Sequence, residues 1–206
     1  MQLVIGRRAS VWLGIALTAC QIAGGTGPGR ELPPPVLASG AVSRAEQAEA
    51  QQLLRSAEAS FEARRFAEAL RTAANLMDRF PAADASGEAL LLSARAEAAL
   101  GAGDRADAAA ERYLGLLGPE DPRSTPVRLL QADVLQGNAA LQLDRLLRID
   151  ATASAVEFEL ALPIARAAAD SLSADELEAV LAGAPTDGPL APIAQVRHAV
   201  NLLDRG

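Results

Sequence analysis

Apolar and small side chains recur three and four positions apart along most of the chain after residue 43, and no stretch alternates apolar and polar residues as a strand would. That spacing places the apolar residues on one face of a helix and predicts amphipathic α-helices. Ser43 and Glu46 form an S-x-x-E capping box, which satisfies two free amides at a helix start. Alanine, leucine, arginine and glutamate, which are good helix formers, dominate the composition. The sequence predicts an all-α fold.

The first two predicted helices meet at a corner near Arg64 and Arg65. The second of them ends before Pro81, which cannot continue a helix. The small residues Ala57 and Ala69 let the two helices approach closely. The apolar and small positions of this pair are Leu53, Leu54, Ala57, Phe61, Phe66, Ala69, Leu70, Ala73, Leu76, Met77 and Phe80.

A second pair repeats the pattern: Ala96 and Ala108 stand where Ala57 and Ala69 stood, 39 residues earlier (57 to 96, and 69 to 108). We expect a helix over 89–100, a turn at 101–103, and a helix over 104–117 capped by Asp104. A loop over 81–87 explains why the offset exceeds the usual tetratricopeptide period of about 34 residues.

These positions resemble a tetratricopeptide repeat, matched at Ala57, Phe66, Ala69, Leu76 and Pro81. Arg64 stands where the repeat has a Gly, and Leu53 where it has a Trp-like residue. The resemblance implies an array of antiparallel helical hairpins, a TPR-like α-solenoid, over residues 43–206. The first helices of such an array form a concave groove that binds peptides or partner domains. The groove side would carry Arg55, Glu58, Glu62, Arg95 and Arg128, each of which equally suits an ordinary solvated face.

Further helices follow with less regularity. We expect Thr125 to cap a third hairpin with Pro126 in its first turn, carrying Val127, Leu130, Val134 and Leu135 inward, and a helix to continue over 141–149. Residues 153–172 are helical in pattern, and Pro163 should kink this helix or mark its start. Ser173 and Glu176 form a second capping box, which begins a short helix that ends near residue 183.

The segment 190–206 has the pattern of a first helix of another hairpin, with Ala199 in the small-residue position and Ile193, Val196, Val200 and Leu203 inward. No second helix follows it. A repeat array usually ends in a polar cap, because an unpaired helix leaves an apolar face exposed. Either the chain is the front portion of a longer protein that frays or self-associates when made alone, or this helix is itself the cap.

The first nineteen residues have the order of an export signal: Arg7 and Arg8, then an apolar run, then small residues before Cys20. The apolar run over 11–19 is shorter than the roughly 20 residues that span a bilayer. The tetrad Leu17, Thr18, Ala19 and Cys20 resembles the lipobox of bacterial lipoproteins.

That resemblance implies that Cys20 is diacylated on sulfur and becomes the new N-terminus. The alternative is a cleaved secretory signal whose cysteine is there by chance. Gln21, rather than Asp, follows Cys20, which in lipoprotein sorting implies the outer membrane, facing the periplasm.

Residues 20–42 are rich in Gly and Pro, with three consecutive prolines at 33–35. Such a composition builds no core and favours a flexible, partly extended tether. The chain thus divides into a lipoprotein signal peptide (1–19), a lipidated Cys with its tether (20–42) and a helical repeat domain (43–206).

The formal charge is −7 for the whole chain and becomes −9 when Met1 to Ala19, with two arginines, is removed. An acidic chain lacks the basic field that nucleic acid requires, so no nucleic-acid partner is expected. The same charge disfavours an anionic lipid surface, so we expect membrane attachment through the lipid anchor only.

Residues suited to catalysis are sparse. His198 is the only histidine and Cys20 the only cysteine, so no zinc site can be assembled. Glu157 and Glu159 are two apart and point to different faces of a helix. The Gly-rich segments lack the Lys-Ser/Thr of a phosphate-binding loop. We expect no enzyme activity, no metal and no cofactor.

The order of lipobox, Gly/Pro tether and repeats resembles the N-terminal part of penicillin-binding protein activators. This implies an interaction scaffold that docks a periplasmic or membrane protein, such as a penicillin-binding protein, and regulates peptidoglycan synthases. Two alternatives are an assembly lipoprotein of the outer-membrane β-barrel insertion machinery and the front part of a solute-binding lipoprotein.

Overall fold

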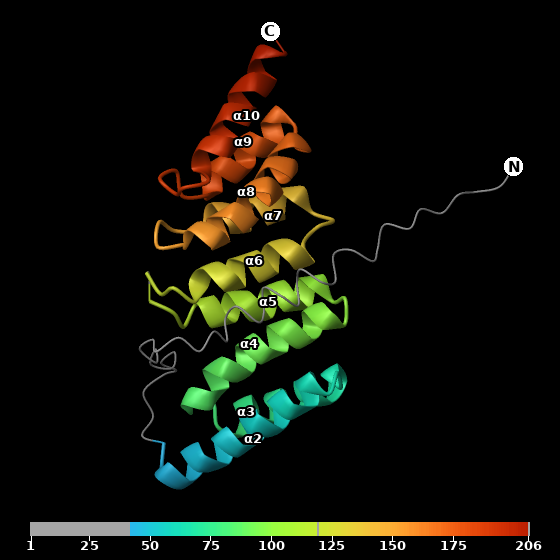
Figure 1. Cartoon of the computed structure of the whole chain (residues 1–206), viewed down its shortest axis with the longest axis vertical. Helices are drawn as coiled ribbons and strands as arrows, with labels where there is room; N and C mark the ends of the chain where they lie inside the picture. Colours follow the sequence, from blue (N-terminus) through green and yellow to red (C-terminus); the bar gives the residue numbers. More distant parts are fainter. Residues whose placement is uncertain (1–41, 119, 206) are drawn as a thin grey trace, which may run out of the picture. The chain divides into compact units, whose positions relative to one another are not determined.

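The computed structural model describes residues 42–118 and 120–205, which form nine α-helices and no strand. The predicted all-α fold is confirmed over this part of the chain. The helices, labelled in Figure 1, are α2 (Arg44–Glu62), α3 (Phe66–Arg79), α4 (Asp84–Ala99), α5 (Gly103–Leu114), α6 (Ser124–Val134), α7 (Ala139–Leu147), α8 (Ala155–Asp170), α9 (Ala174–Gly183) and α10 (Ala191–Leu203). None of these helices is long and apolar enough to cross a membrane.

Two predicted capping boxes are confirmed. The Ser43 hydroxyl accepts a hydrogen bond from the Glu46 amide at 3.2 Å, and the Ser43 amide donates to the Glu46 carboxylate at 2.8 Å. Ser173 and Glu176 exchange the same two bonds at the start of α9. Each box satisfies amides that the first helical turn leaves without a partner.

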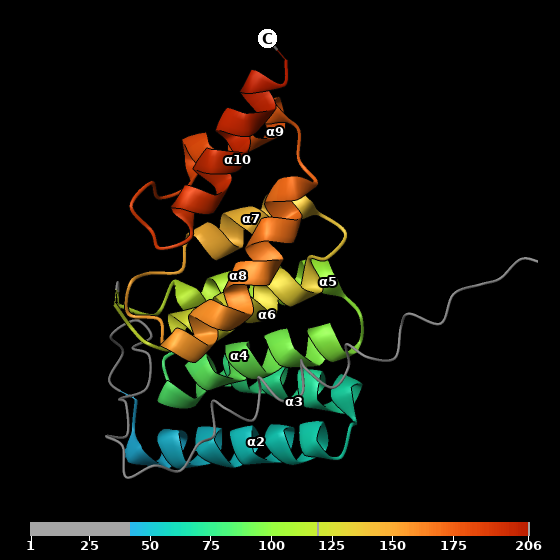
Figure 2. The same ribbon diagram turned by 45° about the horizontal axis from the view of Figure 1, so that its top comes forward.

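Corners of three or four residues, at 63–65, 100–102 and 135–138, join α2 to α3, α4 to α5 and α6 to α7. The two helices of each pair pack on each other, and each pair packs on the next: α4 lies against α2 and α3, and α6 against α5. Figures 1 and 2 show the helices following one another from α2 to α10. A short corner at 171–173 also joins α8 to α9, yet α9 packs mainly on α7 and α10.

Three clusters of buried side chains hold the helices together, and alanine and leucine supply most of them. The first joins α2, α3 and the start of α4; the second joins α4, α5 and α6; the third joins α6 through α10. The largest fully buried side chains are Tyr113, Leu76, Leu143, Leu146, Leu147, Ile149, Leu177 and Leu190. Burying a leucine contributes about 1.5–3 kcal/mol, so these clusters dominate the stability of the fold.

The corners correct the predicted register of the second pair. Arg64 (φ 58°) and Gly101 (φ 74°) both adopt the left-handed conformation two residues before a helix begins, and they are 37 residues apart (64 to 101), not 39. In this register Ala69 corresponds to Ala106, and both are buried. Ala108, predicted as the close-packed residue, is exposed. That prediction was wrong because both hairpins are rich in alanine. An offset of 37 residues and an offset of 39 residues each align alanines of the first pair with alanines of the second.

The predicted loop over 81–87 is shorter than expected, because α4 already begins at Asp84. Pro81 does follow the end of α3, as predicted, immediately after the C-cap residue Phe80. Asp84 lies in the first turn of α4, where a negative charge is favourable beside the free amides of the helix start. Gly87 is buried in this early part of α4.

Two predicted caps are also wrong. Asp104 lies inside the first turn of α5, whose N-cap is Ala102. Thr125 lies inside the first turn of α6, whose N-cap is Arg123, and its side chain is buried. Neither N-cap side chain bonds an amide of its own helix, and the Arg123 guanidinium donates to the Asp121 carboxylate instead. Tertiary packing rather than side-chain capping therefore fixes these two helix starts.

Helix α8 begins at a third capping box, between Ser154 and Glu157, which the sequence analysis did not identify. Pro163 lies within this helix and neither begins nor ends it. Proline has no amide hydrogen and costs a helix interior roughly 3 kcal/mol. Packing of Ala161 and Ala165 on the neighbouring helices therefore outweighs the loss of one hydrogen bond.

Helix α10 turns a different face inward than predicted. Leu190, Ala191 and Ala194 are buried, and Ile193 is partly buried. Val196 is 64% exposed, Val200 38% and Leu203 81%, and Ala199 is exposed as well. The small residues Ala191 and Ala194 face α8 and α9 because they allow close approach of the backbones, which leaves the bulkier apolar stripe in solvent.

Candidate functional site

The residues of the predicted lipid anchor lie outside the part of the chain that the structure describes. These are Arg7, Arg8, Leu17, Thr18, Ala19 and Cys20. Lipidation of Cys20 therefore stays a prediction from the sequence.

Among the predicted repeat-packing residues, Ala57, Ala69, Leu76 and Ala96 are fully buried. Phe66 is half-buried and packs edge-to-face on Phe61, with ring centroids 5.3 Å apart and the rings inclined by 61°. Such an arrangement contributes about 0.5–1.5 kcal/mol beyond burial. It holds the start of α3 against the end of α2. Pro81, Ala108 and Ala199 are exposed.

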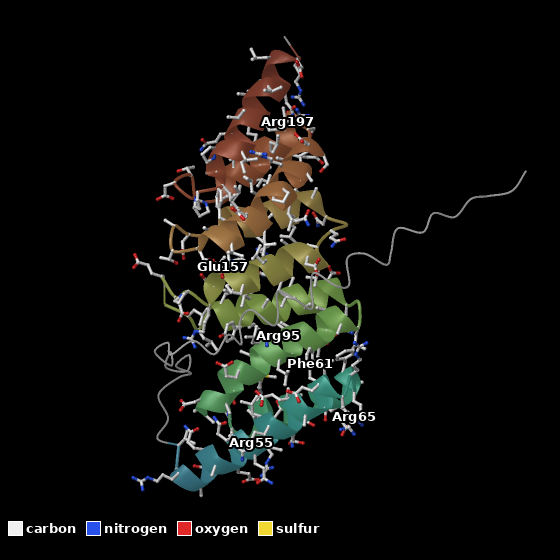
Figure 3. All side chains as sticks on the ribbon, viewed as in Figure 1. Arg55, Phe61, Arg65, Arg95, Glu157 and Arg197 are labelled. Carbon is white, nitrogen blue, oxygen red and sulfur yellow. The ribbon has the colours of Figure 1, made fainter. Side chains whose placement is uncertain are left out.

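Four of the five predicted groove residues lie on the two adjacent first helices. Arg55, Glu58 and Glu62 are on α2, and Arg95 is on α4; Figure 3 labels Arg55 and Arg95. Burial raises the pKa of the Glu58 carboxyl, and the negative charges of Glu62 and Glu88 raise it further, whereas Arg55 and Arg95 act in the opposite direction. The charges of α2 and α4 thus lie close enough to influence one another. We call Arg55, Glu58, Glu88 and Arg95 the α2–α4 charged face.

Arg55, Glu58, Glu88 and Arg95 form no ion pair or side-chain hydrogen bond with any residue that the structure describes. Elsewhere on the surface, Arg79 bonds Glu49 and Arg105 bonds Glu97.

Next to this face, Tyr113 of α5 is completely buried. Burial raises the pKa of its hydroxyl to about 12, with the negative charges of Glu88 and Asp121 adding to the effect. Neither the Tyr113 hydroxyl nor that of the buried Thr125 has a hydrogen-bond partner among residues 42–118 and 120–205. Leaving such a group unpaired costs about 1–3 kcal/mol.

Arg128 does not join the α2–α4 charged face. Its guanidinium bonds the Glu111 carboxylate of α5 and, at 2.9 Å, the side-chain oxygen of Gln131. Burial lowers the pKa of Arg128, while the charge of Glu111 and its hydrogen bond oppose that effect. Only 14% of the Arg128 side chain is exposed, so this arginine is a structural link between α5 and α6.

Arg128 belongs to a larger polar network that the sequence analysis did not identify. The fully buried Gln131 donates to Asp107 at 2.6 Å and to Glu111 at 2.9 Å. Arg145 of α7 bonds both oxygens of Asp107, at 3.0 and 2.9 Å, which raises the pKa of the guanidinium. The i, i+4 spacing of Asp107 and Glu111 was a visible signal, but their partners lie 17 to 38 residues later in the chain.

The residues considered for catalysis, Glu157, Glu159 and His198, lie on two helices, α8 and α10. His198 is half-buried on α10, and its Nε2 atom has no partner within the described part of the chain. Glu157 bonds Ser154 in the capping box, and Glu159 is exposed. No group of three or more His, Cys, Asp or Glu side chains in the described ranges could hold a metal ion.

No family model matches the chain, and comparisons with curated proteins and with solved structures find no significant match. Assignment of a function therefore depends on the residues and on the geometry described above.

Proposed function

We propose that residues 43–206 form a TPR-like array of helical hairpins that acts as a protein–protein interaction scaffold. The recurrence of short corners supports this, as does the left-handed residue before the second helix of two successive pairs, at Arg64 and Gly101. The buried alanines Ala69 and Ala106 occupy the same place in both pairs. Helices α8 and α9 depart from this regular pattern, because α9 packs mainly on α7 and α10.

The observation that carries the proposal is the α2–α4 charged face. Its four side chains have both signs of charge and pair with nothing else in the described structure. Complementary charges on a partner would give specificity and faster association more than raw affinity. A partner segment lying along α2 and α4 would meet Glu58 and Glu88 beside Arg55 and Arg95.

We further propose that the scaffold is held at the periplasmic side of the outer membrane by a lipid on Cys20. The support is the Leu17-Thr18-Ala19-Cys20 tetrad behind Arg7 and Arg8, together with the Gly/Pro-rich tether. Two hydrocarbon chains on one residue supply stable membrane attachment, which a single chain does not. With the resemblance to the N-terminal part of penicillin-binding protein activators, this makes a penicillin-binding protein the partner we propose.

The anchor is tested by expressing the chain in a bacterium with labelled fatty acid. We expect the parent to incorporate label and partition with membranes, and Cys20→Ser to do neither. Label on the Cys20→Ser variant would exclude the proposed anchor.

The scaffold is tested with the purified chain and a purified penicillin-binding protein. We expect Arg95→Glu and Glu58→Arg each to weaken binding about tenfold, mainly through slower association. Arg166→Glu, an exposed charge reversal on α8, is the matched control and should bind like the parent. Equal affinity of the parent and both α2–α4 variants would contradict the proposed face.

A further inference from the structure

A hollow of about 390 Å³ lies on a different side of the molecule from the α2–α4 charged face, where α3 and α5 come near each other over α4. It is lined by Leu70, Ala74, Ser93, Glu97, Arg105, Ala108, Ala109 and Arg112. We call it the α3–α5 hollow. Its volume falls within the range of about 300–1,000 Å³ typical of ligand sites.

The hollow arises from packing. Helices α3 and α5 both pack on α4. Of the six residues that α3 and α5 present to the hollow, three are alanines (Ala74, Ala108 and Ala109), and the half-buried Leu70 lies beside them. The Ser93 hydroxyl is bonded to the Ala89 carbonyl oxygen at 2.7 Å. The floor is therefore apolar, and Ala74 and Ala108 are open to solvent.

Two arginines of α5 lie at the edge of this apolar floor. Arg105 is about one helical turn before Ala109, and Arg112 is about one turn after it. Arg105 bonds the Glu97 carboxylate through Nε at 3.0 Å, although its side chain is 69% exposed. Arg112 is exposed and has no ion pair with any described residue. The hollow thus carries a net positive charge on a chain whose formal charge is −7.

We infer that the α3–α5 hollow is a docking site for an acidic peptide segment, which inserts one aliphatic side chain onto Ala74, Ala108 and Ala109 and places a carboxylate on Arg112. Charge complementarity selects this partner: Arg112 offers an unpaired guanidinium, which binds a carboxylate in a bidentate manner. A basic segment would meet the net positive charge of this edge and is disfavoured. This inference is independent of the α2–α4 charged face and of the lipid anchor.

The test uses the purified full chain with labelled methyl groups and three synthetic nine-residue peptides. One alternates Leu and Glu, one alternates Leu and Lys, and one alternates Ser and Glu. We expect only the Leu/Glu peptide to bind, with NMR shifts concentrated at the methyl groups of Leu70, Ala74, Ala108 and Ala109. The Leu/Lys peptide lacks the carboxylate and the Ser/Glu peptide lacks the aliphatic side chain.

Two variants localise the binding. Ala108→Leu fills the hollow, and Arg112→Glu reverses the charge at its edge. Each variant should lower the affinity for the Leu/Glu peptide about tenfold or more, which corresponds to about 1.4 kcal/mol. Ala167→Leu and Arg166→Glu, matched changes at exposed positions of α8, should leave it unchanged. Arg95→Glu should also leave it unchanged, which separates this site from the α2–α4 charged face.

Three results would overturn the inference. The first is equal binding of the Leu/Lys peptide, and the second is shifts spread over other methyl groups. The third is unchanged affinity in Ala108→Leu and Arg112→Glu. Ala108, Arg112, Arg166 and Ala167 are exposed and Arg95 is half-buried. An unchanged unfolding midpoint would show that each variant remains folded.

Discussion

Arg145 of α7 bonds both carboxylate oxygens of Asp107 on α5, although the two residues are 38 positions apart in the chain. Their side chains are only 16% and 11% exposed. Because Gln131 of α6 bonds the same carboxylate, three consecutive helices meet at one group. This contact fixes the position of one helix pair relative to the next.

We predict that Asp107→Asn lowers the free energy of unfolding by roughly 1–3 kcal/mol, because the amide nitrogen cannot accept the second bond from Arg145. Chemical denaturation measures the change. Asp175→Asn, which breaks the exposed pair with Arg205, serves as the control and should leave the midpoint unmoved. A midpoint for Asp107→Asn equal to that of the parent would show that the network does not join these helices.

The corrected register predicts opposite outcomes for residues that look alike in the sequence. Ala69→Leu and Ala106→Leu should each cost roughly 1–3 kcal/mol by overpacking buried contacts. Ala108→Leu should leave stability unchanged, because Ala108 is exposed above a hollow. Thermal unfolding of the three variants distinguishes the two registers. Loss of stability in Ala108→Leu but not in Ala106→Leu would show that equivalent positions of the two hairpins are 39 residues apart, not 37.

The corner between α4 and α5 gives a third prediction. A Cβ at Gly101 would contact nothing, yet Gly101 has a φ of 74°, so Gly101→Ala should cost about 1–2 kcal/mol through backbone strain alone. A Cβ at Gly103 would lie 2.6 Å from the Val134 carbonyl oxygen, so Gly103→Ala must move α5 away from α6. Gly137→Ala, which meets no atom and has no left-handed φ, is the neutral control.

Tyr113 gives a prediction for alkaline pH. Its pKa is raised from 10.0 to about 12 in the folded chain, so the unfolded state loses this proton first as the pH rises. Folding stability does not depend on this ionisation below pH 10, and it falls between about pH 10 and pH 12 because burial disfavours the ionised hydroxyl in the folded state. Tyr113 is the only tyrosine, so ultraviolet absorbance reports its ionisation directly.

Tyr113→Phe should remove this alkaline loss. At neutral pH it should leave stability unchanged or raise it, because the hydroxyl has no partner within the described residues. A tyrosine that titrates near pH 10 in the folded chain would contradict the burial described here.

Local signals predicted two helix starts correctly through capping boxes, whereas the single cap residues Asp104 and Thr125 were wrongly assigned. The capping boxes at Ser43 and Ser173 begin helices as expected, because the interaction spans only three residues. The register between hairpins was not predictable, since alanines at Ala106 and Ala108 fit the pattern equally and only packing separates them. The same holds for α10, where Val196 and Val200 have inward spacing but lie in solvent.

The residues of the candidate site were likewise predicted only in part. The resemblance to a repeat array assigned Arg55, Glu58 and Arg95 to one groove, and their charges do influence one another across α2 and α4. Arg128 was assigned to the same face and instead bonds Glu111. Spacing along one helix says which face a residue shares, but it does not say which distant side chain will neutralise a charge.

The central claim, that the α2–α4 charged face binds a penicillin-binding protein at the membrane, is most directly tested by site-specific photo-crosslinking in living bacteria. A photoreactive residue replaces Glu58 or Arg95 in turn, with Ala167 on α8 as the control position. We predict a crosslinked product from Glu58 and from Arg95 that fluorescent penicillin labels, and none from Ala167. Products from Ala167 alone, or none that fluorescent penicillin labels at any position, would contradict the account.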